Sequence, residues 1–407
     1  MSREERDVVI AGGGLAGLIA AAAFAAEGFS VLLADPAPQG AVPEGARGPD
    51  LRSTAFLRPA QALLERSGLW ERLAPFATPL EALEAVDSTG WPPRIRARRL
   101  FRSDETGATP FGWNLMNAAT RAALIAHLRA ETRVELALGT GFRDMLARDD
   151  LIIVRLLDGR RIAARLLVGA DGRESAVRDA AGIEADTTRY GQKALTFTVS
   201  HSEPHHNVST EIYNEGGAFT LVPLGNQEGR PASAVVWMND GREALRLMEL
   251  ERAAFERTAT ERSCALYGPL RLLSARAMFP VLTRRARRLT AGRVALVAEA
   301  AHTLPPIGAQ GLNTSLVDVA ALVEAARAHG DGDPGAEPVL AAYARARSRD
   351  IAARAAAIDL FNRVCRSGAP PVQALRALGL RLVHDIAPLR RQVMLAGLGG
   401  HRASSRP

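Results

Sequence analysis

The stretch VVIAGGGLAGLIAAAAFAAEGFSVLLAD, residues 8–35, decides the fold of this 407-residue chain. Its first four residues are apolar, as expected of a short buried strand, and the alanine-rich segment from Leu15 to Glu27 has the length of a helix. Gly28 is a candidate helix C-cap, and Val31 to Ala34 form the next expected strand. The stretch therefore predicts a βαβ unit. We do not interpret it as a membrane span, because glycines cluster at its front and Glu27 interrupts it.

The turn after the first strand carries the G-x-G-x-x-G spacing in Gly12, Gly14 and Gly17. The first glycine permits the tight turn, the second lets a pyrophosphate approach the backbone, and the third allows close packing of helix on strand. Phosphate charge would lie at the helix N-terminus, where Leu15 and Ala16 present their N–H groups. Asp35 ends the second strand, where an acid typically holds a ribose hydroxyl. The pattern predicts a dinucleotide site.

Composition, charge and cysteine content narrow the function classes. The chain is 47% hydrophobic and 23% charged, which is typical of a folded globular protein. Its net charge is +7, but the basic residues are scattered and accompany no nucleic-acid-binding module, so we expect no nucleic-acid partner. Two cysteines, Cys264 and Cys365, rule out a disulfide framework and a cysteine-rich metal site. We expect a cytoplasmic protein.

Helical and strand patterns alternate along the rest of the chain. Helical periodicity covers residues 51–73 and 117–130, whereas residues 83–115 are broken by Gly and Pro and fit short strands and loops. Residues 193–240 alternate between apolar and polar side chains, which predicts an antiparallel sheet with one covered face. From Gly311 onward helices dominate, with a break near the Gly- and Pro-rich HGDGDPGAEP.

A second motif is LLVGADGRESAVR, residues 166–178, in which Asp171 and Gly172 follow an expected strand. By itself this turn is also compatible with an acidic turn that caps a helix. Beside the first motif, it resembles the Asp-Gly motif of single-component FAD-dependent aromatic hydroxylases, the para-hydroxybenzoate hydroxylase class. The resemblance implies that the dinucleotide is FAD, and it places Asp171 near the flavin and near the docking path of NADPH or NADH.

A third motif, ALVAEAAHTLPPIGAQGLN at residues 295–313, resembles the class's Gly-Asp-Ala-Ala-His segment with its Pro-rich turn and Gly-Gln-Gly-x-Asn. The resemblance implies that Glu299 takes the place of the acid that bonds the flavin's ribityl chain. It also implies that the following glycine turn brings the backbone against the isoalloxazine, with a helix opening at Leu312. The expected cofactor-binding residues here are Glu299, Gly308, Gln310, Gly311, Leu312 and Asn313.

Within this class, the chain most resembles the ubiquinone-biosynthesis hydroxylase family, over nearly its whole length. The segments that carry the resemblance are DLRSTAFLRPAQALLERSGLWERL (50–73), FGWNLMNAATRAAL (111–124), YARARSRDIAARAAAIDLF (343–361) and LRRQVMLAGLGG (389–400). Arg52 stands at the position of the family's flavin-contacting arginine. The chain departs from the pattern at Ala298 and Glu299, which replace Gly-Asp, and at Ala118, where many members carry arginine. Arg121, one helical turn later, is the expected substitute.

The resemblance implies an α/β fold in which a Rossmann-like FAD-binding domain carries an inserted antiparallel β-sheet substrate domain and C-terminal helices. The expected FAD-binding domain is discontinuous and comprises residues 1–75, 116–182 and 276–330. The expected substrate domain comprises residues 76–115 and 183–275, and the helical region covers residues 331–407.

The implied activity is an FAD-dependent monooxygenase that uses NADPH or NADH and dioxygen to hydroxylate a polyprenylated phenol. Because the cofactor supplies the oxidative chemistry, the sequence does not call for a catalytic acid or base, and we identify none. Two alternatives stay open: an FAD-dependent oxidoreductase for another aromatic substrate, and a flavin-fold scaffold of low activity in a biosynthetic complex.

Two further patterns bear on partners. Leu375, Leu378, Leu382 and Ile386 recur at helical spacing among arginines. They favour either a peripheral contact with the inner face of the membrane or with a ubiquinone-synthesis complex, or packing on the chain's own FAD-binding domain. The histidines of HSEPHH, residues 201–206, fit a sheet edge or loop, so we expect no metal site there.

Overall fold

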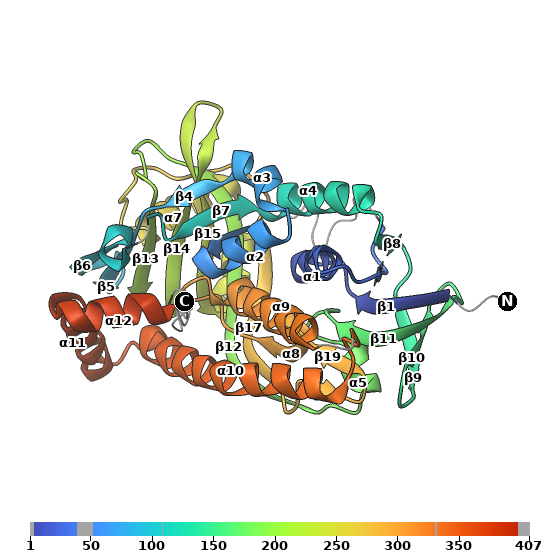
Figure 1. The fold of residues 1–407 in the computed structure, drawn as a ribbon. Helices are drawn as coiled ribbons and strands as arrows, with labels where there is room; N and C mark the ends of the chain where they lie inside the picture. The colour runs from blue at the N-terminus through green and yellow to red at the C-terminus, as the bar shows by residue number, and fades with distance from the viewer. Residues whose placement is uncertain (1–3, 39–51, 108, 330–331, 398–407) are drawn as a thin grey trace.

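The structure, a computed structural model, describes residues 4–38, 52–107, 109–329 and 332–397. Two large sheets form the body of the molecule, and a long helix, α10 (Glu337–Arg366), runs from one to the other (Figure 1). α10 contacts β18 (Thr290–Ala291) of the first sheet and β13 (Val208–Asn214) and β14 (Gly217–Gln227) of the second. The expected α/β fold class is confirmed.

The first sheet has eight strands and contains the predicted βαβ unit. Its strand order is β18-β19-β11-β1-β2-β8, with β10 pairing to β11 and β9 to β10. Besides β18, its members are β1 (Glu4–Ala11), β2 (Val31–Asp35), β8 (Val134–Leu138), β9 (Phe142–Ala147), β10 (Ile152–Leu156), β11 (Arg161–Gly169) and β19 (Val294–Leu296). β19, β11, β1, β2 and β8 run parallel, so their carboxyl ends share one edge.

Helix α1 (Leu15–Ala26) joins β1 to β2 and is buried on nearly all sides. It contacts α4 (Asn117–Ala130) and α9 (Gln310–Ala328) as well as the sheet. Its run of four alanines, Ala20–Ala23, is at most 3% exposed. The small side chains explain the alanine-rich sequence, because they let two other helices pack closely on α1.

Residues 53–73 depart in part from the predicted helix. Ser53–Leu57 form a strand, β3, which pairs with β7 (Gly112–Met116) in a three-stranded sheet completed by β4 (Thr78–Leu80). Only then do α2 (Arg58–Arg66) and α3 (Trp70–Leu73) follow. The helix prediction is wrong at β3 because pairing with a distant strand outweighs local periodicity, and because Pro59 suits the first turn of a helix rather than its interior.

The second sheet has nine strands in the order β20-β17-β12-β15-β14-β13-β5-β6, with β16 beside β12. All its pairs are antiparallel except β13 with β5. Besides β13 and β14, its members are β5 (Ala82–Thr89), β6 (Arg94–Arg102), β12 (Ala185–Ser200), β15 (Arg230–Asp240), β16 (Arg271–Leu272), β17 (Ala277–Ala286) and β20 (His302–Thr303). The predicted boundary at residue 276 precedes β17, and the domain division stays a prediction.

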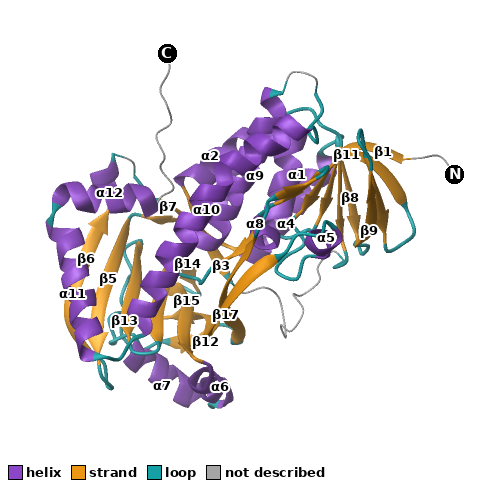
Figure 2. Cartoon of the chain, turned by 90° about the horizontal axis from the view of Figure 1, so that it is seen from below, coloured by secondary structure: helices purple, strands orange, loops and turns teal. Residues whose placement is uncertain are grey.

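Both faces of this sheet are covered, so the expectation of a single covered face is wrong. On one face, Leu195 and Phe197 pack with Phe255 of α7 (Arg252–Arg262), next to α6 (Gly241–Glu249). On the other face, Tyr213 packs with Cys365 of α10 and Met394 of α12 (Ala387–Gly397). Figure 2 shows α6 and α7 on the opposite side of the sheet from α10. The helices that cover the second face, α10 and α12, come from the end of the chain, so the local pattern of residues 193–240 could not predict them.

The remaining helices follow the predicted pattern from residue 311 onward. α9 ends at Ala328 and α10 begins at Glu337, which matches the expected break, and α11 (Pro370–Asp385) then leads into α12. α11 packs beside β6 at the edge of the nine-stranded sheet (Figure 2). No helix within the described ranges is long and apolar enough to cross a membrane.

Candidate cofactor site

The three predicted motifs and Asp35 meet at one edge of the eight-stranded sheet. Residue pairing places Ala11, the end of β1, beside Gly169, the end of β11, and beside Ala34 of β2; Gly169 in turn pairs with Leu296 at the end of β19. The glycine turn, Asp35, Asp171 and Glu299 each come at or just after one of these ends. In open α/β sheets this carboxyl edge is where ligands bind.

The three glycines of this turn have two different roles. A Cβ at Gly12, whose φ is +113°, would lie 2.2 Å from the carbonyl oxygen of Ala170, and a Cβ at Gly17 would lie 2.0 Å from that of Gly12. These two glycines are therefore required by the fold itself. Gly14 has ordinary extended backbone, is exposed, and a Cβ there would meet nothing within 4 Å. The space before the N-terminus of α1 is thus an open backbone cradle, which fits a pyrophosphate.

Asp35 and Arg121 both bear on this turn. One Asp35 carboxylate oxygen accepts from the N–H of Gly13 and the other from the N–H of Ala37 at 2.8 Å, which fixes the carboxylate beside the turn with acceptor capacity left for a ribose. Arg121 on α4 donates from Nε to the carbonyl oxygen of Gly13 at 3.3 Å. Arg121, the expected substitute for the arginine that many family members carry at the position of Ala118, therefore points to the glycine turn.

The Asp171 turn acts as a helix cap in the protein alone. The carboxylate of Asp171 accepts from the Ser175 hydroxyl and from the Val177 N–H, at the start of the short helix α5 (Ala176–Ala180). Arg178 of α5 is buried and donates to the carbonyl oxygen of Ala300 at 3.3 Å. The second and third motifs are thus tied together, and the capping alternative describes the contacts that Asp171 makes here.

The third motif contains two non-glycine residues in left-handed backbone. Ala298 and Ala309 each have φ of 56°, a conformation that costs an L-residue roughly 1–2 kcal/mol. Ala298 begins the one-turn helix α8 (Ala298–Ala301), on which Glu299 is exposed. The following helix, α9, begins at Gln310 rather than at Leu312, because the left-handed Ala309 is its N-cap.

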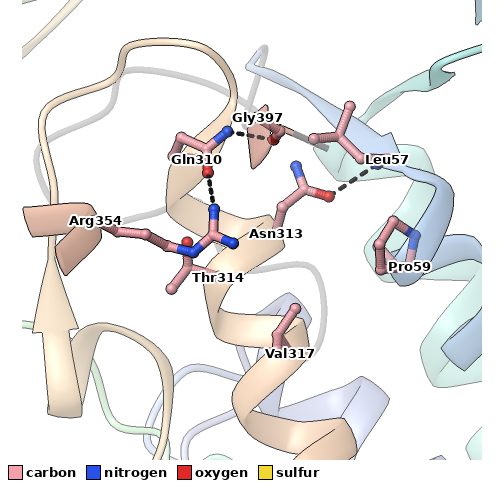
Figure 3. Close-up of a pocket in the computed structure, with 9 residues that line it drawn as sticks. Leu57, Pro59, Gln310, Asn313, Thr314, Val317, Arg354 and Gly397 are labelled. Carbon is pink, nitrogen blue, oxygen red and sulfur yellow. Dashed lines mark hydrogen bonds between the residues drawn. The ribbon is translucent and has the colours of Figure 1, made fainter. Parts of the chain in front are cut away.

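The side chains of two predicted site residues in this motif form hydrogen bonds within the protein (Figure 3). Asn313 accepts from the N–H of Leu57 and donates to the carbonyl oxygens of Ala55 and Ala309, which ties the loop to β3. Gln310 donates to the carbonyl oxygen of Gly397 at 2.9 Å. These side chains hold the loop in place.

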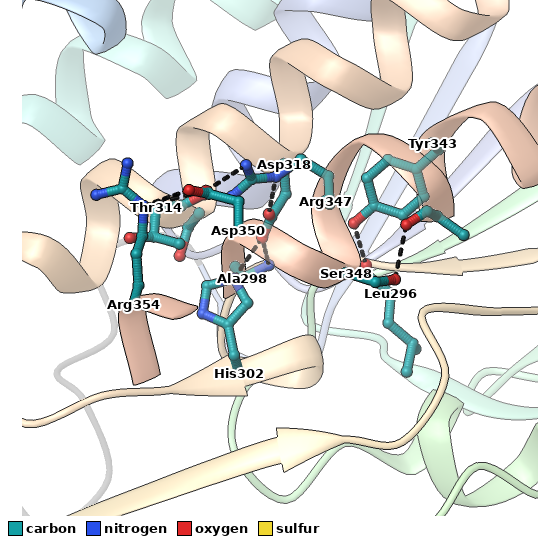
Figure 4. A network of polar contacts seen from close by, with 12 residues as sticks. Leu296, Ala298, His302, Thr314, Asp318, Tyr343, Arg347, Ser348, Asp350 and Arg354 are labelled. Carbon is teal, nitrogen blue, oxygen red and sulfur yellow. Dashed lines mark hydrogen bonds and ion pairs between the residues drawn. The ribbon is translucent and has the colours of Figure 1, made fainter. Parts of the chain in front are cut away.

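A buried polar network behind the loop was not foreseen from the sequence. Asp318 of α9, fully buried, accepts from Nε of Arg347 at 2.8 Å, from His302 Nε2 at 2.5 Å, and from the N–H of Ala298 at 3.3 Å (Figure 4). Arg347 of α10 also pairs with Asp350 at 2.6 Å. The network fixes the loop from the side away from solvent, and His302 is part of it through its contact with Asp318.

The charges of this network reinforce one another. Burial works against the charged guanidinium, but Asp318 and Asp350 outweigh it and raise the pKa of Arg347. Burial likewise opposes ionisation of Asp350, while hydrogen bonds from Arg354 and Arg347 lower the pKa of its carboxyl. Arg354 also donates to the side-chain oxygen of Gln310 at 2.9 Å, so the chain of contacts runs from Ala298 to the start of α9.

Two other predictions can be located. The guanidinium of Arg52 lies 4.9 Å from the centre of the Phe279 ring on β17. Two histidines of HSEPHH contact the protein: His201 bonds the Ser233 hydroxyl and the Glu203 carbonyl oxygen, and His205 bonds the Leu224 carbonyl oxygen. Across the described part of the chain, no cluster of three metal-ligating side chains occurs.

Comparisons with known proteins agree with this geometry. Residues 5–357 match the FAD binding domain family model. The chain is 34% identical to the ubiquinone hydroxylase UbiL of Rhodospirillum rubrum, over 98% of this chain and 91% of that protein. It is 28% identical to the 3-demethoxyubiquinol 3-hydroxylase of Escherichia coli, over 98% of this chain and all of that one.

Among solved structures, the p-nitrophenol 4-monooxygenase PnpA of Pseudomonas putida superposes with a TM-score of 0.78 at 21% identity, covering 99% of this chain and 100% of that one. This likeness concerns the fold alone. Taken with the match to the FAD binding domain model and the whole-length similarity to named ubiquinone hydroxylases, it leads to one conclusion: the chain is an FAD-dependent monooxygenase that belongs to the ubiquinone-biosynthesis hydroxylase family.

Proposed function

We propose that this enzyme hydroxylates the aromatic ring of a polyprenylated phenol in ubiquinone biosynthesis, with NADPH or NADH as electron donor and dioxygen as oxygen source. The observation that carries the proposal is the meeting of the glycine turn, Asp35, Asp171 and Glu299 at one sheet edge, in a chain whose relatives bear ubiquinone hydroxylase names over 98% of its length.

We assign each part of FAD to one of the elements that meet at this edge. The pyrophosphate would lie on the N-terminus of α1, the adenosine ribose on Asp35, the ribityl chain near Glu299, and the isoalloxazine against the backbone of the glycine turn that opens α9. The full set proposed to hold the cofactor is Gly12, Gly14, Leu15, Ala16, Gly17, Asp35, Arg52, Arg121, Asp171, Glu299, Gly308, Gln310, Gly311, Leu312 and Asn313.

When bound, FAD takes electrons from the nicotinamide and supplies activated oxygen. The chain's own task is to hold the ring and keep water away from it. We place the aromatic ring of the substrate at the face of the nine-stranded sheet that carries Tyr213 and Ala218. The turn of the third motif reaches this face, because Gly308 lies next to Glu211. Phe361 and Met394 cover the same face and make its wall apolar.

The prenyl tail calls for access to a membrane, and α11 offers a surface for it. Three of its leucines, Leu375, Leu378 and Leu382, are 61%, 51% and 46% exposed. The helix is anchored by buried Arg376, which donates to Asp87 of β5 at 2.7 Å. An exposed leucine stripe beside basic residues such as Arg381 suits an anionic lipid surface. We therefore propose a peripheral membrane contact through α11.

Two experiments test the activity. The purified protein should show the visible absorption of bound flavin, and this band should bleach when NADPH or NADH is added without oxygen. A host that lacks the gene should accumulate a prenylated ring one hydroxyl short of the next intermediate, and labelled dioxygen should supply that hydroxyl's oxygen.

Normal ubiquinone in the deletion strain, with no second hydroxylase present, would refute the substrate assignment and favour another aromatic substrate. A protein without flavin, or one whose flavin is never reduced, would favour the scaffold.

A further inference from the structure

A carboxyl group lies buried between the nine-stranded sheet and the glycine turn of the third motif. Glu211, on β13, is 6% exposed. Its carboxyl accepts a hydrogen bond from the Tyr213 hydroxyl, two residues along the same face of the strand, and the backbone of Gly308 lies close enough to lower its pKa. Glu211 therefore lies between the sheet face where we place the ring and the turn where we place the isoalloxazine.

The surroundings of Glu211 supply little to stabilise its negative charge. Its neighbours on this face include the apolar Phe111, Ala218 and Met394, which pack around Tyr213. The ionisable groups that interact with Glu211 are Tyr213 and Cys365 of α10, and these two in turn lie near Arg376 of α11 and Asp87 of β5. Arg376 pairs with Asp87, both nearly fully buried, and Asp87 also pairs with Arg96. Within the described ranges, no arginine or lysine forms an ion pair with Glu211.

A buried carboxyl without a cation is costly, and such groups gather at functional sites. Burial raises the pKa of Glu211, although the hydrogen bond from Tyr213 and the backbone of Gly308 work in the opposite direction. A carboxylate with a raised pKa is a stronger base and is better matched to proton transfer near neutral pH. Burial also raises the pKa of Tyr213 well above its ordinary value, so this hydroxyl stays a hydrogen-bond donor that orients the carboxylate.

We propose that Glu211 is the base that removes the proton from the ring hydroxyl of the phenol. In this step the O–H bond of the phenol breaks, an O–H bond forms on the carboxylate, and the electron pair stays on the ring oxygen. The ring becomes richer in electrons and so more reactive toward an electrophilic oxygen. Tyr213 and the backbone of Gly308 are the positioning groups that hold the carboxylate toward the ring. The inference rests on the proposed substrate being a phenol.

The test compares the FAD-loaded wild-type enzyme with Glu211→Gln, which keeps the shape and a hydrogen-bond acceptor but cannot take the proton. The matched control is Glu256→Gln, since Glu256 is an equally buried carboxyl of the same part of the chain that bonds Arg252, Arg271 and the Leu272 N–H instead. The probe is 2-geranylphenol, and two quantities are measured: the pH profile of kcat, and the phenolate absorption of the bound probe at neutral pH.

In Glu211→Gln, kcat at neutral pH should fall on the order of a hundredfold. The rise of the profile should move up toward the ionisation of a free phenol, at a pH of about 10. The bound probe should lose its phenolate absorption, while FAD binding stays unchanged and Glu256→Gln behaves as wild type in both readouts. An unchanged profile and an unchanged phenolate signal in Glu211→Gln would overturn the inference.

If Glu211→Gln does not fold, Glu211→Asp takes its place. It should keep the neutral-pH part of the profile at a reduced rate, and loss of that part would overturn the inference. Failure of the proposed function looks different: the wild-type enzyme would then hydroxylate no prenylated phenol at any pH. The phenolate signal is read without turnover, so it tests Glu211 separately.

Discussion

Replacing Gly14 with valine separates the cofactor role of the glycine turn from its role in folding. The backbone at Gly14 has φ −70° and ψ 175°, which any L-residue adopts, and a Cβ there meets no protein atom within 4 Å. The folded protein therefore accommodates the new side chain, and the free energy of unfolding should change by less than about 1 kcal/mol. The side chain would instead fill the space in front of α1 that we assign to the pyrophosphate.

The loss of FAD affinity follows from the hydrogen bonds that the phosphate would lose. Each bond to a charged group contributes about 1.5–3 kcal/mol, so losing one weakens FAD binding by a factor of about 10 to 150. Gly17→Ala is the contrasting variant, since its Cβ would lie 2.0 Å from a backbone oxygen. It should lower the free energy of unfolding by about 1–3 kcal/mol.

The assay combines two titrations on the same preparations. Quenching of flavin fluorescence gives the FAD dissociation constant, and urea unfolding of the cofactor-free protein, followed by tryptophan fluorescence, gives the stability. A folded Gly14→Val protein that binds FAD as tightly as wild type would refute the assignment of this turn. Equal losses of stability in both variants would show that the open space at Gly14 has been misjudged.

Three other predictions test the loop network and the surface. Asp318→Ala should lower the free energy of unfolding by about 3–5 kcal/mol, because it removes the fully buried partner of Arg347 and leaves that guanidinium only Asp350; Asp385→Ala, at an exposed pair, should leave the urea midpoint unchanged, and equal effects would contradict the reasoning. Ala298→Gly should raise the free energy of unfolding by about 1 kcal/mol by relieving the left-handed alanine, and a lower urea midpoint would count against it. Leu378→Glu should reduce sedimentation with vesicles of anionic phospholipid, whereas Leu245→Glu, at an exposed leucine on α6, should not; equal binding by both variants would exclude α11 as the membrane contact.

The βαβ unit, the three motifs and the family could be inferred from the sequence, because each depends on local chemistry. A tight turn, a phosphate-accepting backbone and a helix start need particular residues at fixed spacing, as in Gly12, Gly14 and Gly17. The backbone at Gly14 is open in the folded chain for the same reason that the motif requires a glycine there. The alanine-rich sequence of α1 likewise predicts a helix against which other helices can pack closely.

Tertiary structure decided what depends on distant partners. Nothing near Asp318 in the sequence marks it as the centre of a network, because its partners lie on other elements: Arg347 on α10 and His302 on β20. Glu211 is one of several acids in its region, and only its burial opposite Gly308 distinguishes it. Ser53–Leu57 became a strand because β7 was there to pair with it. Burial and pairing are properties of segments brought together by packing, so a motif can fix where a cofactor sits while the side chains that brace and assist it emerge only once the chain has folded.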